Sequence, residues 1–345
     1  MDYYLECTKC GSGFSSDYDR QLCGRCGGIL DVIYKGRLKI PKSASFWDYE
    51  SVLPDSEYTR YALGGTALVE SNSHSGLFLK LELCNPTGSF KDRGSVIEIA
   101  KANEYGYKEI AVASTGNMAY SLAYYAKASG TRVIAFIGGA ANPDKVRNIL
   151  MTHDAKIYRA HKDFSAAQAA AIKYSEKTGA FLAGDYCYRK EGQRTIAYEI
   201  AAQLKGFIHI IIPVGNATLL SGIAKALHEM RAKARIIAVQ AEGCSPLAKS
   251  FRLGRPVRYE TPRTKADAIA VGMPTYGTEA VRAIRESGGT VVTVDDSEMQ
   301  AAQEALYKND GVRAELAGAA SIAAYGKLRF RRGDKVVAII SGGNL

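Results

Sequence analysis

The sequence predicts an α/β protein with mainly parallel sheets, preceded by a small cysteine-rich segment. Two observations predict the α/β class: short apolar runs alternate with longer stretches of helical periodicity, and the runs are apolar throughout rather than at every second residue. Such runs are typical of strands in a parallel sheet that helices cover on both faces. A third observation, two C-x2-C motifs near the N-terminus, predicts the small segment.

The expected strands and helices alternate along the chain, which is typical of βαβ units and a doubly wound body. Lys35–Pro54 has weak periodicity and two prolines, and we expect it to link the cysteine-rich segment to that body. The expected strands are Leu77–Leu81, Ile110–Ala113, Val133–Ile137, Ile208–Ile212, Ile236–Val239, Thr290–Val294 and Val336–Ile340. The expected helices include Met118–Ser129, Ser165–Lys177, Gly192–Leu204, Leu219–Ala232 and Glu298–Lys308.

Composition limits the class of protein. The 345 residues carry a net charge of +10, which favours an anionic ligand, a nucleic acid or an acidic partner. No run of 18 apolar residues is present, so a membrane-spanning helix is not expected. Met1–Cys7 lacks the basic head and apolar stretch of a secretory signal, and with the cysteine usage this favours a cytoplasmic location.

Four cysteines form the pattern C-x2-C-x12-C-x2-C, with glycines beside the second cysteine of each pair: Cys7, Cys10, Cys23 and Cys26. A two-residue gap lets both thiolates reach one tetrahedral ion, so the pattern predicts a structural zinc ribbon with no open coordination position. The alternatives are a ribbon without metal and a redox pair, but no strand and helix frame either motif. The remaining cysteines are expected to be small buried hydrophobic residues: Cys84, Cys187 and Cys244.

The first unusual junction between strand and helix is Asn85–Gly94, which follows an expected strand. Pro86 and Gly88 predict a rigid turn that places Lys91 at or near a helix start. A lysine is unfavourable there, because the helix dipole prefers negative charge at that end. Lys91 is therefore either a solvent-exposed cation or an amine kept reactive for Schiff-base chemistry by a depressed pKa.

Two further junctions join small polar residues to the start of a helix. Ser114–Asn117 follows the strand that ends at Ala113, and Pro213–Gly222 follows the strand that ends at Ile212. Free backbone amides at a helix start suit a phosphate or carboxylate. Ser, Thr and Asn are also ordinary N-caps, so neither junction is specific by itself.

Taken together, these motifs resemble the fold type II pyridoxal-phosphate enzymes (the tryptophan synthase β family), and within them the threonine synthases. The resemblance begins at about Leu63 and covers more than four-fifths of the chain. It implies a two-lobed, three-layer αβα fold in which 41–90 and 179–345 form the larger cofactor-binding lobe, 91–178 a smaller inserted lobe and 1–40 the zinc-ribbon-like segment. Further segments that carry it are Leu63–Leu68, Tyr188–Thr195, Val239–Gly243 and Ala319–Ser321.

The resemblance also implies roles for single residues. Lys91 would hold pyridoxal 5'-phosphate as a Schiff base and then act as the base at the substrate Cα. Asn117 would hydrogen-bond the phenolic oxygen of the cofactor. The residues expected near the substrate carboxylate are Ser114, Thr115 and Gly116. The backbone amides expected to bind the cofactor phosphate belong to Gly215, Asn216, Ala217, Thr218 and Leu219, although the family commonly has a glycine and an asparagine at the last two positions.

Ser341 would meet the pyridine nitrogen of the cofactor. A neutral hydroxyl leaves that nitrogen largely unprotonated, which favours elimination and replacement over transamination and so implies a lyase. Ser341–Asn344, which reads Ser-Gly-Gly-Asn, is more similar to serine/threonine dehydratases and cysteine synthases, whereas threonine synthases more often have threonine at this place.

Lys80 and Arg189 match family positions that bind the phosphate of the substrate, and arginine suits forked phosphate contacts. They favour threonine synthase, which converts O-phosphohomoserine and water to threonine and phosphate. The alternatives are a serine/threonine dehydratase and a β-replacement synthase that uses O-phosphoserine, like cysteate or cysteine synthase. Enzymes of this family are commonly homodimers. A nucleic-acid partner, suggested by the basic runs Lys35–Lys39 and Lys327–Arg332, is less expected because charge runs are usually solvated faces.

Overall fold

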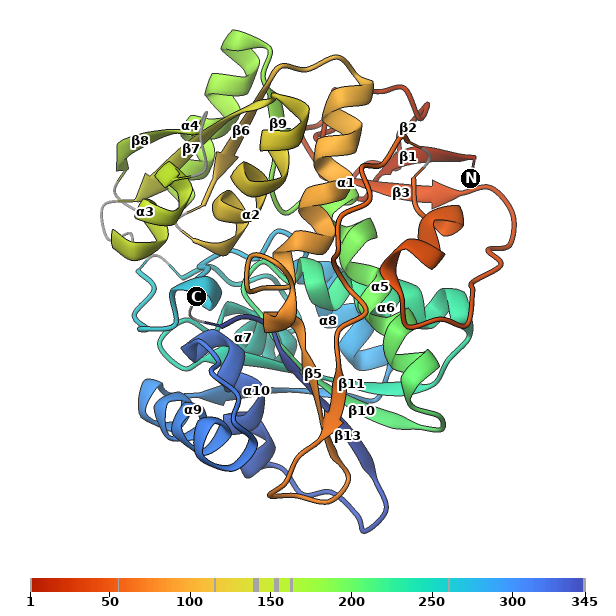
Figure 1. Ribbon diagram of the computed structural model, residues 1–345, viewed down its shortest axis with the longest axis vertical. Coiled ribbons are helices and arrows are strands. Elements are labelled where there is room, and N and C mark those ends of the chain that lie inside the picture. Colours follow the sequence, from red (N-terminus) through yellow and green to blue (C-terminus); the bar gives the residue numbers. More distant parts are fainter. Residues whose placement is uncertain are drawn as a thin grey trace. The chain divides into compact units, whose positions relative to one another are not determined.

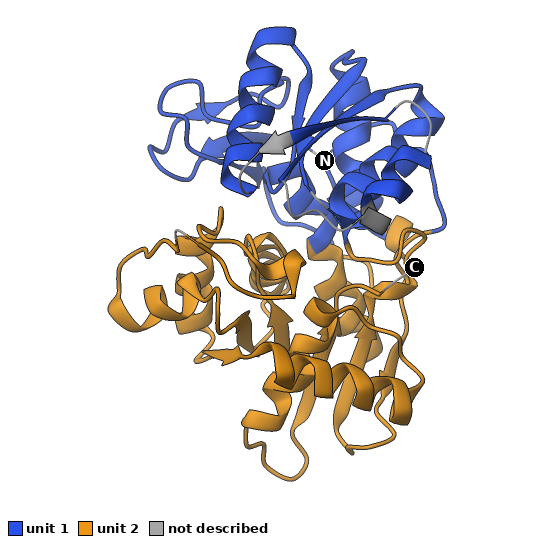
Figure 2. Cartoon of the chain, turned by 90° about the vertical axis from the view of Figure 1, so that its left-hand side faces the viewer, with its two compact units in different colours: residues 1–39, 49–62, 91–193 blue, residues 40–48, 63–90, 194–345 orange. Residues whose placement is uncertain are grey.

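The computed structural model describes residues 2–54, 56–114, 116–138, 143–151, 155–161, 164–259 and 261–343 (Figure 1). The chain forms two compact units (Figure 2). Unit 1 comprises Met1–Lys39, Tyr49–Ala62 and Lys91–Gln193; unit 2 comprises Ile40–Asp48, Leu63–Phe90 and Arg194–Leu345. The chain therefore passes from unit 2 into unit 1 at the bond between Phe90 and Lys91. The domain boundaries expected from the resemblance stay a prediction.

Unit 1 contains a parallel four-stranded sheet in the order β8-β7-β6-β9. Helix α4 packs on β6 and β7, where small alanines allow a close approach to Ile134 and Phe136. The strands are β6 (Glu109–Ala113), β7 (Arg132–Gly138), β8 (Ala155–His161) and β9 (Phe181–Ala183). The helices are α1 (Lys91–Glu104), α2 (Asn117–Ala126), α3 (Pro143–Met151), α4 (Phe164–Thr178) and the start of α5 (Cys187–Gln203).

The cysteine-rich segment belongs to unit 1 and forms an antiparallel sheet of its own, in the order β2-β1-β3. Its strands are β1 (Tyr3–Cys7), β2 (Gly13–Phe14) and β3 (Leu30–Tyr34). Along β1 the residues alternate between buried and half-buried, as in a small sheet with one covered face.

Unit 2 is built on a six-stranded sheet in the order β12-β11-β10-β13-β5-β4, in which only β4 is antiparallel to its neighbour. The strands are β4 (Leu68–Glu70), β5 (Leu77–Leu81), β10 (Ile208–Pro213), β11 (Ala234–Ala241), β12 (Thr290–Val294) and β13 (Lys335–Ile340). The helices are α6 (Thr218–Met230), α7 (Pro246–Leu253), α8 (Gly277–Glu286), α9 (Asp296–Asp310) and α10 (Leu316–Lys327), and they cover both faces (Figure 1). Every residue of β10 is buried. The predicted α/β class with parallel-rich sheets is confirmed.

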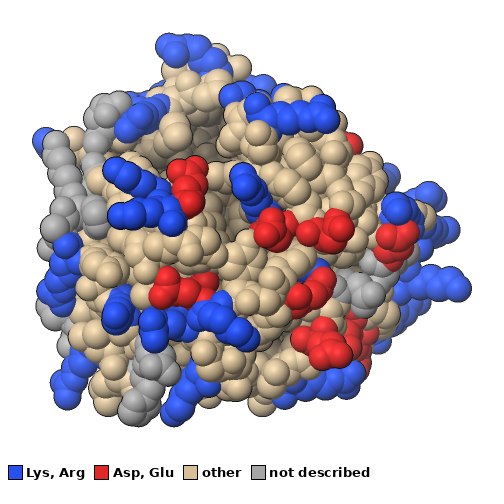
Figure 3. Space-filling model, turned by 90° about the horizontal axis from the view of Figure 1, so that it is seen from above, with Lys and Arg blue, Asp and Glu red and all other residues tan. Residues whose placement is uncertain are grey.

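Short 3-10 turns join several elements: Phe46–Val52, Glu82–Cys84, Lys127–Ser129 and Asp267–Ile269. Among the described residues, no helix has the length and apolar character that crossing a membrane requires. On the face drawn in Figure 3, lysines and arginines are spread over the whole outline, and acidic side chains lie among them. This face shows no single basic stripe of the kind that tracks a nucleic-acid backbone.

Candidate active site

Three of the loops predicted from the sequence lie at one edge of the sheet in unit 2. They follow β5, β13 and β10, which are neighbouring parallel strands, so their carboxyl ends share that edge. The three loops are Asn85–Phe90, Ser341–Gly343 and Gly215–Ala217. Open parallel sheets bind their ligands at this edge.

The loop that precedes Lys91 is hydrogen-bonded to the end of the chain. The Phe90 amide donates to the Ser341 carbonyl at 3.0 Å, and the Gly343 amide donates to the Gly88 carbonyl at 2.9 Å. Ser341 is buried, and the backbone of the lysine loop fixes its position. Two motifs about 250 residues apart in the sequence are thus brought together in unit 2, as the resemblance implies.

The loop before α6 has the geometry of an anion cradle. A Cβ at Gly215 would lie 2.9 Å from the Ala268 carbonyl oxygen, so a side chain has little room there. Ala217 has a left-handed backbone (φ 65°), which is uncommon for a residue with a Cβ and turns the chain sharply into the helix. One turn later, the buried hydroxyl of Ser221 has no hydrogen-bond partner among the described residues. The helix start, the cradle and this hydroxyl fit a phosphate group.

Polar side chains in and beside this loop form hydrogen bonds with neighbouring segments. The Asn216 side-chain oxygen accepts from the Thr275 hydroxyl at 3.1 Å. Gln240, which lies in one of the family-like motifs, accepts from the Leu247 amide at 2.8 Å, and its amide donates to the Val214 carbonyl at 3.4 Å. Gln240 therefore links the residue before the Gly215–Ala217 loop to the start of α7.

Lys91 is the first residue of α1 in unit 1, with 18% of its side chain exposed. Burial lowers the pKa of its amine, and the nearby Arg189 acts in the same direction, whereas Asp185 raises it. The Lys91 Nζ lies 3.7 Å from the Asp185 Oδ1. Asp185 follows β9 and was not singled out in the sequence. The lowered pKa increases the neutral fraction of the amine, the form that can act as nucleophile or base.

Arg189 lies in α5 and is fully buried, and residues of unit 1 bind its guanidinium group. It forms an ion pair with Glu98 and donates to the Gly184 carbonyl at 3.0 Å and to the Lys91 carbonyl at 3.1 Å. Burial raises the pKa of Glu98 to about 7, so this carboxyl depends on the guanidinium for its charge. The expected contact of Arg189 with a substrate phosphate finds no support in this arrangement.

Helices α1 and α5 approach closely at this point. A Cβ at Gly94 would clash with the Arg189 side chain, and a Cβ at Gly192 would clash with the Arg93 carbonyl oxygen. The two glycines therefore let the helix that begins at Lys91 and the helix that carries Arg189 touch through their backbones.

Substitution of Arg189 distinguishes a structural from a substrate-binding role. Arg189→Ala leaves Glu98 buried without its cation, and we expect a loss of about 3–5 kcal/mol in the free energy of unfolding, measured by urea denaturation. Arg132→Ala is the matched control in unit 1, because its exposed ion pair with Glu109 is worth only about 0–1 kcal/mol. An Arg189→Ala protein of unchanged stability with a raised KM for a phosphorylated substrate would contradict the structural role.

The Ser114–Asn117 junction follows β6 and leads into α2. The buried Ser114 hydroxyl accepts from the Gly116 amide at 3.3 Å and from the Ala119 amide at 3.4 Å. Asn117 is the first residue of the helix. Thr115, expected near the substrate carboxylate, lies outside the described residues. Ser114 thus shapes the start of α2, and the roles of these residues toward ligands stay predictions.

Lys80 is also fully buried, in unit 2. Its Nζ lies 2.7 Å from a Glu199 oxygen and donates to the Thr66 carbonyl at 2.7 Å and to the Gln203 side chain at 3.0 Å. An ammonium has three donors, and these contacts use all three. The expected contact of Lys80 with a substrate phosphate therefore finds no support either. The network supports the Gly-Gly-Thr motif, because the other Glu199 oxygen accepts from the Gly65 amide at 2.9 Å.

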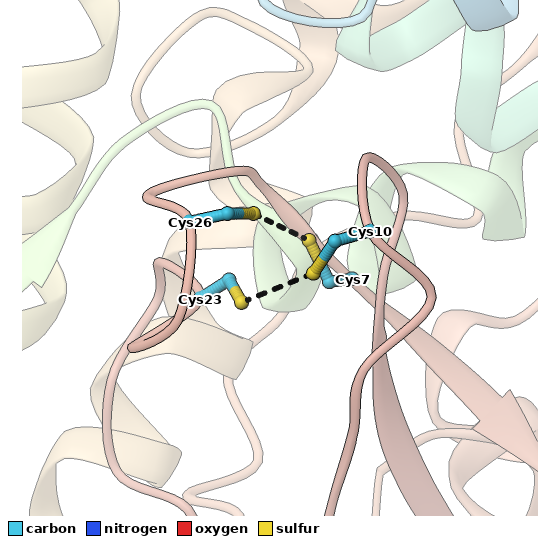
Figure 4. A group of neighbouring side chains, drawn as sticks. All are labelled: Cys7, Cys10, Cys23 and Cys26. Atoms are coloured by element: carbon cyan, nitrogen blue, oxygen red, sulfur yellow. Dashed lines mark hydrogen bonds between the residues drawn. The ribbon is translucent and has the colours of Figure 1, made fainter.

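The four paired cysteines form a cluster in unit 1 (Figure 4). All four Sγ atoms lie within 4.8 Å of one another. Both C-x2-C motifs form the same turn: the Gly11 amide donates to the Cys7 carbonyl and the Gly27 amide to the Cys23 carbonyl, each at 2.9 Å. Both glycines are left-handed (φ 69° and 67°), which explains why glycine follows each motif. Cys187 and Cys244 are buried as expected, but Cys84 is exposed because it ends a surface 3-10 turn.

The cysteine segment contacts the first turn of α5. The Tyr34 hydroxyl donates to Glu191 at 2.6 Å, and Lys190 pairs with Asp31 at 2.6 Å. The segment also contacts α1, where the Lys101 Nζ lies 5.6 Å from the centre of the Tyr3 ring. It therefore contacts both α1, which begins at Lys91, and α5, which carries Arg189.

Known proteins are similar to this chain in sequence and in fold. A family model of pyridoxal-phosphate dependent enzymes matches residues 59–342. A threonine synthase of Methanosarcina acetivorans is 37% identical, with 99% of this chain and 91% of that protein aligned. A threonine synthase of Methanocaldococcus jannaschii is 33% identical, with 98% of this chain and 92% of that protein aligned. The solved structure of maize serine racemase is similar with a TM-score of 0.73 and 27% identity, over 81% of this chain and 88% of that one. The chain therefore belongs to the family of pyridoxal-phosphate-dependent enzymes.

Proposed function

We propose that the protein is a threonine synthase, a lyase that converts O-phosphohomoserine and water to threonine and phosphate. The extent of the alignments carries this proposal. Both threonine synthases align with nearly the whole chain, so the alignments include the cysteine segment, whereas the family model begins only at residue 59. The alignment of the N-terminal segment with these two threonine synthases adds to the similarity of the catalytic body.

The proposed cofactor-binding groups are those that the family resemblance implies. Lys91 would hold the aldehyde carbon of pyridoxal phosphate, the Gly215–Leu219 amides its phosphate, Asn117 its phenolic oxygen and the Ser341 hydroxyl its ring nitrogen. When bound, the cofactor supplies an electron sink for the carbanion at the substrate Cα.

Lys91 carries the proton transfers of the proposed reaction. Its amine, once displaced by the substrate amine, takes the proton from Cα and returns a proton to the carbon skeleton. Burial favours the neutral, basic form of this amine, and Asp185 stabilises the ammonium that forms when the proton is taken. Arg189 acts as a positioning residue, because it binds the Lys91 carbonyl rather than a reacting atom.

A comparison of products tests the proposal. The holoenzyme is expected to release phosphate from O-phosphohomoserine and to form an equal amount of threonine. Keto-acid formation from serine or threonine, without phosphate release from O-phosphohomoserine, would contradict the proposal. That result would favour a dehydratase, the alternative suggested by the serine and two glycines at Ser341–Gly343. Turnover of O-phosphoserine with an added nucleophile would instead favour a β-replacement synthase.

We also propose that the cysteine cluster binds one structural zinc ion. Four thiolates at about 2.3 Å from a tetrahedral zinc ion lie about 3.8 Å apart. The cluster already has Sγ separations of 3.5 Å between Cys7 and Cys26 and 3.8 Å between Cys10 and Cys23. The donor set is closed, so the ion would stabilise the fold and take no part in the reaction.

Location and assembly are further proposals. Four reduced thiolates suit a reducing compartment, which supports the cytoplasm. A homodimer rests on the family resemblance, and light scattering of the purified holoenzyme would measure it. Under this proposal the partner of the chain is a second copy and its ligand a small phosphorylated amino acid. The mixed charges of Figure 3 give no support to a nucleic-acid partner.

A further inference from the structure

Unit 2 contains a cavity of about 410 Å³ at the edge of the sheet opposite to the cofactor loops. Its walls come from the starts of β10, β11 and β12 and from the turn before β13. These strands are parallel, so their starts lie at the edge away from Gly215–Ala217 and Ser341. The volume is that of an ordinary site for a small organic ligand.

The cavity wall is strongly basic. Arg235, Arg329 and Arg331 line it, and all three are exposed. In the part of the chain that the structure describes, no carboxylate pairs with any of their guanidinium groups. The acidic residue in the wall is Asp334, which accepts from the Arg331 amide at 2.8 Å and lies 3.5 Å from the His209 Nε2. Three guanidinium groups against one carboxylate leave a net positive wall that attracts an anion.

The same wall offers aromatic surface. The ring of the buried His209 contacts those of Phe207 and Phe330, with centroids at 5.3 and 5.2 Å. Phe207 lines the cavity and is half exposed. The His209 Nε2 lies 3.5 Å from Asp334. The cavity therefore combines a cationic wall with an exposed aromatic ring.

We propose that this cavity binds a small organic phosphate of the nucleoside monophosphate class. The guanidinium groups suit a phosphate dianion, because they donate paired, charge-assisted hydrogen bonds. The half-exposed Phe207 ring suits a planar ring of the ligand. The site also accounts for two arginines of the basic run Lys327–Arg332. It does not depend on the proposed reaction.

Calorimetric titration of the holoenzyme tests the proposal. Its cofactor site is already filled, so a phosphate probe cannot bind there. The probes are AMP, ribose 5-phosphate and inorganic phosphate. We expect AMP to bind one site per chain, more tightly than the other two. Loss of one guanidinium contact is worth about tenfold in affinity, so Arg235→Ala and Arg329→Ala should each weaken AMP binding by about that factor.

Arg332→Ala is the matched control, since Arg332 is the next residue of the same exposed run and does not line the cavity. It should leave the affinity for AMP unchanged. Equal weakening by Arg332→Ala would overturn the proposal, because attraction would then follow net charge alone. No AMP binding at millimolar concentration, or AMP no tighter than inorganic phosphate, would also overturn it. The visible absorbance of the cofactor should be the same in all variants and confirms that they are folded.

Discussion

Lys91→Ala is expected to lower kcat by about 10³-fold or more, because it removes both the covalent anchor of the cofactor and the base at Cα. The other cofactor contacts remain, so pyridoxal phosphate should still bind but should leave on dialysis. The visible absorbance that borohydride abolishes in the parent protein should be missing. Steady-state kinetics on O-phosphohomoserine and an absorbance spectrum after dialysis measure the two effects.

Lys108→Ala is the matched control, since Lys108 is an exposed lysine of the same unit, four residues after the end of α1. It should keep both the spectrum and kcat. The fold should survive in both variants, because the ion pair between Lys91 and Asp185 is long, at 3.7 Å. Turnover by Lys91→Ala at a tenth of the parent rate or above would contradict the role given to this residue.

Cys23→Ser is expected to release the zinc ion and to destabilise unit 1. In zinc-finger peptides, structural zinc contributes roughly 10–16 kcal/mol of apparent binding energy, so we expect a loss of about 3 kcal/mol or more here. The segment contacts α1 through Lys101 and α5 through Lys190 and Glu191, so its loss should loosen both helices near Lys91. Metal analysis by mass spectrometry and the thermal midpoint of the holoenzyme measure the effect.

Cys84→Ser serves as the control for the thiol substitution, because Cys84 is exposed and outside the cluster. It should retain one zinc ion per chain and the parent midpoint. A parent protein that contains no zinc after expression in zinc-supplemented medium would contradict the metal site. A Cys23→Ser protein that loses zinc but keeps its midpoint would contradict the stabilising role.

Much of the fold is predictable from the sequence, because buried parallel strands are apolar throughout. All seven expected strands are present. Among the strands that were not expected, β8 is an edge strand with polar residues, and β9 has only three residues. Helix α5 begins at Cys187 rather than at Gly192. The first turn of α5 carries charged residues, which would ordinarily be expected on the surface. They are buried instead, and they form ion pairs with the cysteine segment and with α1.

Parts of the candidate site that form one local motif could be predicted from the sequence. Ion pairs between residues far apart in the sequence could not. Lys91 and the loop Gly215–Leu219 follow from strand-to-helix junctions. The pairing of Arg189 with Glu98 and of Lys80 with Glu199 depends on helices that meet only in the folded chain. Sequence could not distinguish a cation free to bind a ligand from one already paired. Asp185 was missed for the same reason, since it follows β9, a short strand that was not expected.

The central claim is that Lys91 carries the cofactor. Borohydride reduction of the holoenzyme, proteolysis and mass spectrometry of the peptides test it most directly, because reduction makes the link between cofactor and lysine permanent. The expected result is one pyridoxyl-phosphate group per chain, attached to Lys91. A reduced cofactor on any other lysine, or a protein loaded with pyridoxal phosphate that forms no stable adduct, would contradict the claim.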